Sequence, residues 1–436
     1  MVNNGVKLWN KAKKIIPGGN QLLSKRSDQF LPDQWPSYYR KAKGINVWDM
    51  DNNRYVDMSI MGIGACTLGY ADEDVNKAVE DAIENGSMCT LNCYEEVELA
   101  EKLLKIEKWG GMVRYARTGG ESTSIAIRIA RAATNKDKIA FCGYHGWQDW
   151  YLSSNLTSNE NLTDHLLPGL NPLGVPKCLE NTALPFNYNN INDLEEIITK
   201  EDDIGAIIME PVRNFDPDSS FLKKVRKIAD EIGAVLIFDE ITSGWRLRVG
   251  GAHSIYGVDP DIIIFGKAMG NGHPIGAILG KEEIMETAQE TFISSTFWTE
   301  RVGFAAGLAT INKMEITDNP KHLISAGKQI TRGWESIADE HDLSLQTMGI
   351  PPLTTFQFDD DNSLKMQTLF NQEMLYRGYL ASNHVYTCSH HTDQVIDEYL
   401  EAVADVFKIV ACAQEQDKYN DLLHGPVISK GFKRLN

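Results

Sequence analysis

The sequence places a lysine and an aspartate directly after short apolar runs, where side chains can be held out of water. Lys267 follows residues 262–265 and Gly266, and Asp239 follows residues 234–238. A desolvated lysine has a lowered pKa and becomes a nucleophile towards an aldehyde. A buried carboxylate needs a positive or hydrogen-bonding partner, which a protonated pyridine nitrogen supplies. We expect both residues to be catalytic, although a solvated lysine and a turn-capping aspartate are the ordinary alternatives.

Two further groups fit the same kind of site. Gly119 and Gly120 precede a helix expected at residues 122–133, and glycines at a helix start let backbone N–H groups and the helix dipole meet a phosphate. Tyr144 follows another apolar run and could cover a flat ring. A plain helix start and a tyrosine packed in the core are the alternatives.

These residues need a common scaffold, and the apolar runs provide it. Runs of four or five apolar residues at 138–142, 206–209, 234–238 and 262–265 alternate with amphipathic helices such as 72–84 and 95–107. Such runs are typical of strands in a parallel sheet that is buried on both faces. Ligands bind at the carboxyl ends of these strands, so the residues after the runs should share one site.

The sequence therefore predicts an α/β protein with a large domain at residues 61–325. Residues 1–60 should hold a helix and a hairpin through 45–57 that turns at Asp51–Asn53, and 326–436 should end in a helix at 394–412. The terminal pieces are expected to form one small α+β domain.

Composition excludes several classes of function. The net charge of −17 argues against nucleic acid or an anionic membrane as partner. No stretch is long and apolar enough to span a membrane, and the N-terminus is no secretion signal, so we expect a cytoplasmic protein. The seven scattered cysteines contain no Cys-x-x-Cys pair, which favours reduced thiols and predicts no metal site. Nucleotide-binding glycine motifs are also absent.

Taken together, these motifs resemble the class III aminotransferases of fold type I, and within them the glutamate-1-semialdehyde 2,1-aminomutases and their relatives. The resemblance runs from about residue 8 to 410 and rests on Pro17–Gly19, Val47–Asp57, Ala126–Arg131, Tyr144–Trp147, Gly174–Lys177, Met209–Pro211, Phe238–Ile241 and Gly266–Ala277.

The resemblance implies pyridoxal 5′-phosphate as cofactor, bound as a Schiff base to Lys267. It makes Asp239 the partner of the pyridinium and Tyr144 the stacking aromatic, with the cofactor-binding set completed by Gly119, Gly120, Glu121, His145, Glu210 and Thr296. The amides of residues 119–121 would bind the phosphate. Thr296 would reach the phosphate of the neighbouring subunit, which implies a homodimer with shared active sites.

Three departures from the family pattern lie near the expected site. Gly120 stands where the family has Thr or Ser, so one side-chain contact to phosphate is lost. The runs Val212–Phe215 and Trp298–Arg301 also differ. Together with Trp147, the residues Trp298, Glu300 and Arg301 would enlarge or recharge a pocket built for a small keto acid derivative.

The substrate prediction follows from these departures. In the aminomutase pattern a basic residue soon after Pro17–Gly19 binds the substrate carboxylate, and here Lys25 and Arg26 are candidates without matching spacing; a solvated basic pair is the alternative. We predict a transaminase that moves an amino group from a donor such as glutamate to a small or sugar-related carbonyl acceptor. The alternatives are the aminomutase, then a racemase or decarboxylase, and, from another class, a non-enzymatic binding protein.

Overall fold

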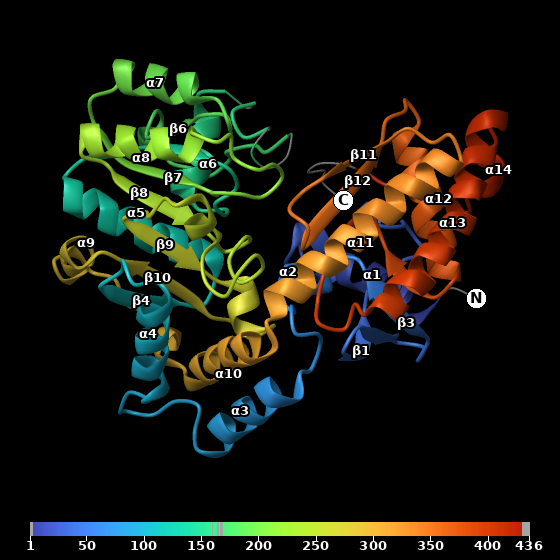
Figure 1. Ribbon diagram of the computed structural model, residues 1–436, viewed down its shortest axis with the longest axis horizontal. Helices are drawn as coiled ribbons and strands as arrows, with labels where there is room; N and C mark the ends of the chain where they lie inside the picture. The colour runs from blue at the N-terminus through green and yellow to red at the C-terminus, as the bar shows by residue number, and fades with distance from the viewer. Residues whose placement is uncertain (1–2, 159, 164, 166–168, 430–436) are drawn as a thin grey trace. The chain divides into compact units, whose positions relative to one another are not determined.

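The computed structural model describes residues 3–158, 160–163, 165 and 169–429 (Figure 1). The chain forms two compact units, one of residues 1–72 with 321–436 and the other of residues 73–320. The first boundary lies beyond the expected residue 60, because the backbone of Tyr70 pairs with Gly44 and so ties this segment to the N-terminal strands.

The larger unit is built on a mostly parallel sheet of seven strands in the order β4-β10-β9-β8-β7-β5-β6 (Figure 1). Neighbouring strands from β9 through β6 run parallel, and β10 is antiparallel to both β9 and β4. The strands are β4 (Met112–Ala116), β5 (Lys138–Cys142), β6 (Ala183–Pro185), β7 (Ile204–Met209), β8 (Val235–Asp239), β9 (Ile262–Phe265) and β10 (Gly276–Gly280).

Both faces of this sheet are buried, as the uninterrupted apolar runs predicted. Every residue of β7, β8, β9 and β10 is buried. Ile208, Ile237 and Ile264 pack in one cluster with residues of α5, while α8 contacts β7 and β8. The helices are α3 (Glu73–Glu84), α4 (Glu95–Ile106), α5 (Gly119–Thr134), α6 (Asp149–Leu152), α7 (Ile191–Lys200), α8 (Phe221–Ile232), α9 (Glu282–Met285) and α10 (Arg301–Thr317).

The smaller unit combines the two ends of the chain. Its four-stranded sheet has the order β1-β2-β3-β13, so a strand of the C-terminal part pairs in parallel with the predicted hairpin. A three-stranded sheet, β11-β12-β14, lies in the C-terminal part. Its elements are α1 (Asn4–Ile15), β1 (Tyr39–Lys43), β2 (Asn46–Asp49), β3 (Arg54–Met58), α2 (Met61–Gly64), α11 (Asn319–Glu340), β11 (Leu345–Met348), β12 (Leu353–Phe358), α12 (Ser363–Tyr376), β13 (Tyr379–Ala381), β14 (His384–Tyr386), α13 (Asp393–Gln416) and α14 (Tyr419–Leu422).

Aromatic side chains fill the core of the smaller unit. Phe356 of β12 packs edge to face on Trp334, Phe370 and Phe407, which come from α11, α12 and α13. The indole N–H of Trp334 donates to the hydroxyl of Tyr399 at 3.0 Å. No helix among the described residues is long and apolar enough to cross a membrane. All seven cysteines lie within the described ranges and all are free thiols.

Candidate active site

Four adjacent strands bring the predicted residues to one edge of the large sheet. Cys142 of β5 lies opposite Met209 of β7, and Met209 lies opposite Phe238 of β8. The residues that follow these positions therefore emerge side by side, with Asp239 opposite Ile264 of β9. This register gathers Tyr144, Glu210, Asp239 and Lys267 at the carboxyl edge, as expected for a parallel sheet.

Lys267 begins the short 3₁₀ helix η6 (Lys267–Gly270), with a positive φ of 39°. Its amine donates a hydrogen bond to Oγ1 of Thr242 at 2.7 Å. Burial first, and then the positive charges of Arg213 and Arg246, lower the pKa of Lys267 to about 8, against opposing effects of Glu210 and Asp239. A sizeable fraction of neutral amine is therefore present near neutral pH, which is what a nucleophile towards an aldehyde requires.

Asp239 is buried, with 3% of its surface exposed, and His145 holds its carboxylate. Oδ2 lies 2.8 Å from Nδ1 of His145, and Oδ1 accepts the backbone N–H of Ile241 at 3.1 Å. The other ring nitrogen of His145 lies 3.0 Å from the carbonyl oxygen of Cys142. A carbonyl and a carboxylate both accept, so both contacts are hydrogen bonds when His145 carries a hydrogen on each nitrogen. The histidine thus orients the aspartate.

Tyr144 is held through its backbone. Its N–H donates to Oε2 of Glu210 at 3.2 Å, and Nη1 of Arg213 contacts the same oxygen at 3.1 Å. The half-buried phenol ring lies edge to face with Tyr151, at a centroid distance of 6.1 Å. Glu210 is thus engaged with the Tyr144 backbone and with Arg213.

The predicted phosphate site lies at the start of α5, which begins at Gly119 rather than at the expected Ser122. Thr118 caps the helix: its side chain accepts the N–H of Glu121 at 3.4 Å, and the carboxylate of Glu121 accepts the N–H of Thr118 at 2.9 Å. This capping box overcomes the low helix propensity of the two glycines. As the first two residues of α5, Gly119 and Gly120 have no intrahelical acceptor for their amides, and no backbone acceptor outside the helix binds them among the described residues.

The segment around Thr296 is exposed, and its charged residues have structural partners. Thr296 begins the short helix η8 (Thr296–Thr299). Glu300 caps α10 by accepting the N–H of Val302 at 2.8 Å, and Arg301 forms an ion pair with Glu95 at 2.6 Å. Glu300 and Arg301, which were predicted to recharge a substrate pocket, thus have partners at the start of α10.

The remaining substrate candidates differ in their surroundings. Arg26 is 5% exposed and forms an ion pair with Asp28 at 2.8 Å, so the solvated basic pair considered above is wrong for this residue. Lys25 is exposed and, like Arg26, belongs to the smaller unit. Trp147 is 72% exposed and belongs to the larger unit.

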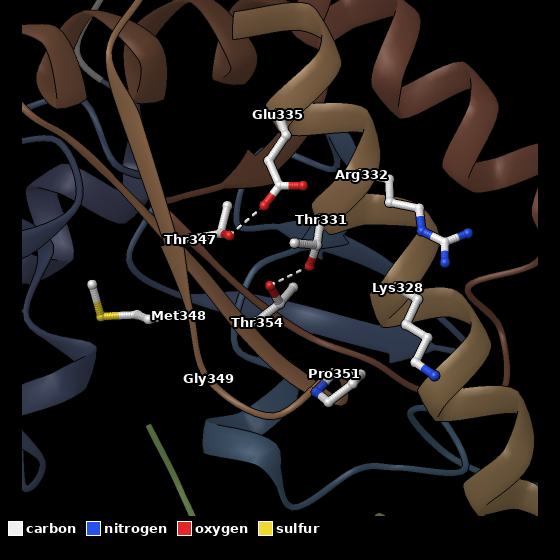
Figure 2. Close-up of a pocket in the computed structure, with 9 residues that line it drawn as sticks. All are labelled: Lys328, Thr331, Arg332, Glu335, Thr347, Met348, Gly349, Pro351 and Thr354. Atoms are coloured by element: carbon white, nitrogen blue, oxygen red, sulfur yellow. Dashed lines mark hydrogen bonds between the residues drawn. The ribbon is translucent and has the colours of Figure 1, made fainter. Parts of the chain in front are cut away.

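One cavity borders Trp147, and a second lies in the smaller unit away from the predicted site residues. One, of about 420 Å³, is lined by Trp147, Gln148, Asp149, Trp150 and four residues of α5. The other, of about 300 Å³, lies in the smaller unit beside α11 and β12 (Figure 2). Its side chains pair across it, Thr331 with Thr354 and Thr347 with Glu335 (Figure 2), and it contains none of the strand-end residues. Among the described residues, no group of three or more His, Cys, Asp or Glu is placed to hold a metal ion.

Three residues of the site were missed from the sequence. Thr242 accepts a hydrogen bond from the Lys267 amine, and Arg213 lowers the pKa of that amine. The side chain of Gln148 lies against Gly120. Position in the turn after Asp239 was a usable signal for Thr242. The contact of Gln148 with Gly120 had no signal, because it joins residues on separate elements.

Comparison with known proteins gives a consistent result. A sequence model of the class III aminotransferases matches residues 32–401. The chain is 32% identical over 413 residues to the 3-aminobutyryl-CoA aminotransferase of Cloacimonas acidaminovorans, covering 91% of this chain and 95% of that protein. It is 31% identical over 434 residues to the glutamate-1-semialdehyde 2,1-aminomutase of Ignicoccus hospitalis, covering 94% and 100%.

Solved structures are similar over the same length. The FumI protein of Sphingopyxis sp. MTA144, solved in its PLP internal aldimine form, superposes with a TM-score of 0.85 at 25% identity, covering 94% of this chain and 97% of that one. A glutamate-1-semialdehyde aminomutase from Pseudomonas aeruginosa PAO1 has a TM-score of 0.78 at 18% identity, covering 93% and 94%, and so shares the fold.

Proposed function

Because this chain belongs to the class III aminotransferase family, whose members are pyridoxal-phosphate-dependent enzymes of fold type I, we propose that it transfers an amino group from an amino-acid donor to a small or sugar-related carbonyl acceptor. The observation that carries the proposal is the pair of Lys267, with its lowered pKa, and the buried Asp239 at adjacent strand ends.

The residues present fit the cofactor in their chemistry. Lys267 offers an amine for its aldehyde, and Asp239 offers a carboxylate for its ring nitrogen. Tyr144 offers an aromatic ring beside them, and the amides of Gly119 and Gly120 offer donors for a phosphate. When bound, pyridoxal phosphate supplies an aldehyde that condenses with amines and a ring that takes up negative charge.

Each protein group would then have one task. Lys267 would bind the cofactor covalently and, once released, move a proton through Nζ between two carbon atoms. Thr242 would orient Nζ. Asp239, held by His145, would keep a proton on the ring nitrogen. Tyr144, fixed by Glu210, would cover one face of the ring.

The donor half of the reaction is the direct test of this proposal. Incubating the cofactor-loaded protein with glutamate alone should convert the cofactor to pyridoxamine phosphate and release about one equivalent of 2-oxoglutarate per site. Absorbance and chromatography measure the two products. A Lys267→Ala preparation is the control for non-enzymatic exchange.

The alternative is the aminomutase, which the similarity to several such enzymes favours. The ion pair of Arg26 with Asp28 speaks for the transaminase, because Arg26 would have to leave Asp28 to bind a substrate carboxylate. If no amino acid yields the pyridoxamine form, while glutamate-1-semialdehyde becomes 5-aminolevulinate without an added donor, the aminomutase replaces our proposal.

Cofactor uptake should depend on pH through Lys267. Only the neutral amine adds to the aldehyde, and the pKa of Lys267 is lowered from 10.5 to about 8. The second-order rate of cofactor addition to the apo-protein should therefore rise about tenfold per pH unit below pH 8 and level off above it. Stopped-flow absorbance measures the profile. Arg213→Met removes a positive charge and should move the plateau to higher pH; a profile that rises steadily to pH 10 in the unsubstituted protein would contradict the lowered pKa.

We further propose a homodimer with shared sites, in a cytoplasmic protein with reduced thiols. Exposed apolar side chains support it: Phe297, next to Thr296, is 67% exposed, and Leu91 and Tyr94 are 78% and 62% exposed. These two segments are joined, because the N–H of Arg301 donates to the carbonyl of Ser87 at 2.9 Å. A second copy of the chain would cover this surface.

Subunit mixing tests the role of Thr296. Lys267→Ala chains should be inactive alone. Thr296→Ala chains should also be inactive alone when the cofactor is limiting, provided that the change weakens cofactor binding by about tenfold or more. Mixed dimers contain one intact site if Thr296 serves the neighbouring subunit, so activity should recover towards about a quarter of the unsubstituted level, as random pairing predicts. Differently tagged chains verify the exchange. Absence of recovery after verified exchange would refute a shared site.

A further inference from the structure

The missing side chain of Gly120 leaves a space that Gln148 fills. A methyl group added at Gly120 would lie 1.9 Å from Nε2 of Gln148 and 2.6 Å from its Cδ. The carboxamide of Gln148 therefore occupies the position where any larger residue at 120 would place its first side-chain atom. Gln148 precedes α6, whereas Gly120 is the second residue of α5, so the fold brings together residues from separate elements.

The orientation of the carboxamide is set by its own loop. Oε1 of Gln148 accepts the backbone N–H of Trp147 at 3.1 Å. The same oxygen lies 2.4 Å from the place of an added methyl group at Gly146, whose φ is +118°. Both Nε2 and Oε1 lie close to the place of an added methyl group at Gly120, but Nε2 is the nearer of the two and Oε1 already accepts the N–H of Trp147. No protein acceptor for Nε2 is recorded among the residues that the structure describes.

Nε2 joins a set of donors at the start of α5. Ser122 donates its N–H to the carbonyl of Thr118, and Glu121 donates to the Thr118 hydroxyl, which leaves the amides of Gly119 and Gly120. Two backbone N–H groups, one side-chain amide and the positive end of a long helix suit an oxyanion with several acceptor oxygens, such as a phosphate monoester.

We propose that Gln148 binds the phosphate group of the cofactor and takes the place of the side chain that Gly120 lacks. This inference rests on the proposed function, because it assumes that the aldehyde end of the same cofactor lies at Lys267. It also makes residues 120 and 148 a coupled pair. A side chain at 120 displaces the carboxamide, so one of the two positions, but not both, supplies the donor.

Gln148→Met is the primary test, because it keeps the size of the side chain and removes the donor. The dissociation constants of pyridoxal phosphate and of pyridoxal, which lacks the phosphate, are measured for each apo-protein by absorbance titration. We expect Gln148→Met to lower the affinity for pyridoxal phosphate by about tenfold or more and to change the affinity for pyridoxal by no more than about twofold. Gln148→Glu should weaken the binding of pyridoxal phosphate further, because a carboxylate repels the phosphate. Gln289→Met, at an exposed position of the same unit, is the matched control.

The outcomes separate the possible errors. If the binding of both ligands weakened equally, Gln148 would only pack against α5. If the binding of neither ligand changed, Gln148 would not touch the phosphate. Either result overturns the inference while the proposed function stands. If the unsubstituted protein bound neither ligand, the proposed function would fall and this inference with it. Circular dichroism and thermal melting confirm that each variant is folded.

A double-mutant cycle tests the coupling. In the Gly120→Ser chain the new hydroxyl should displace Gln148 and supply the donor itself, because the contact is with the end of a flexible side chain. Adding Gln148→Met to that chain should then change the affinity for pyridoxal phosphate by less than about twofold. Equal losses with and without the serine would show that the two positions act independently.

Discussion

Treating the cofactor-loaded protein with borohydride should fix pyridoxal phosphate on Lys267 and on no other lysine. Borohydride reduces the carbon–nitrogen double bond between cofactor and lysine to a stable amine, so peptide mapping by mass spectrometry locates the labelled residue. The expectation rests on the amine of Lys267. This amine is desolvated and hydrogen-bonded to Thr242, and its pKa is lowered to about 8.

Lys267→Ala should remove both the label and the turnover. We expect turnover to fall by at least about three orders of magnitude, because the chain loses its covalent anchor and its proton-transfer base together. Lys281→Ala is a suitable control, since Lys281 follows β10 of the same sheet but forms an ion pair with Asp261 at 2.7 Å. A label on Lys281 or elsewhere, or full activity of Lys267→Ala, would refute the assignment.

Asp239→Asn should give the second-largest effect while leaving the cofactor bound. The amide has nearly the same shape as the carboxylate, but it cannot hold a proton on the ring nitrogen by charge. Turnover should fall by roughly two to four orders of magnitude, whereas the borohydride label on Lys267 should persist. Separating binding from turnover in this way distinguishes a chemical role from a structural one.

Asp261→Asn is the matched control for this experiment. Asp261 is also buried, but Arg226 and Lys281 are its partners, at 2.9 Å and 2.7 Å. Its substitution should lower the thermal stability and leave turnover of the folded protein largely intact. Near-normal turnover of Asp239→Asn would instead make Asp239 a structural cap at the end of β8.

The sequence predicted the sheet because each strand has a local signal, a run of four or five apolar residues. The four apolar runs became β5, β7, β8 and β9, and the hairpin of β2 and β3 formed as expected. Lys267 and Asp239 could be placed for the same reason, since Asp239 ends β8 and Lys267 comes shortly after the end of β9. The start of α5 was set too late, although Thr118 and Glu121 carry the spacing of a capping box that predicts it.

The remaining features depend on contacts between distant parts of the chain. Arg301 forms its ion pair with Glu95, and Asp239 is oriented by a hydrogen bond with His145. Neither partner can be read from local spacing, because side-chain pairing is set by how the elements pack. For the same reason the lost contact at Gly120 was visible in the sequence, whereas its replacement by Gln148 was not.

The backbone of Lys267 shows how selection for folding and selection for activity oppose each other at one position. Its φ of 39° lies in the left-handed region, which costs a residue with a side chain roughly 1–3 kcal/mol. A glycine there would relieve that strain and remove a buried charge, so a stability screen of the apo-protein would favour losing this lysine. Laboratory evolution for heat resistance alone would therefore drift towards an inert protein, and any such campaign needs catalysis in its selection step.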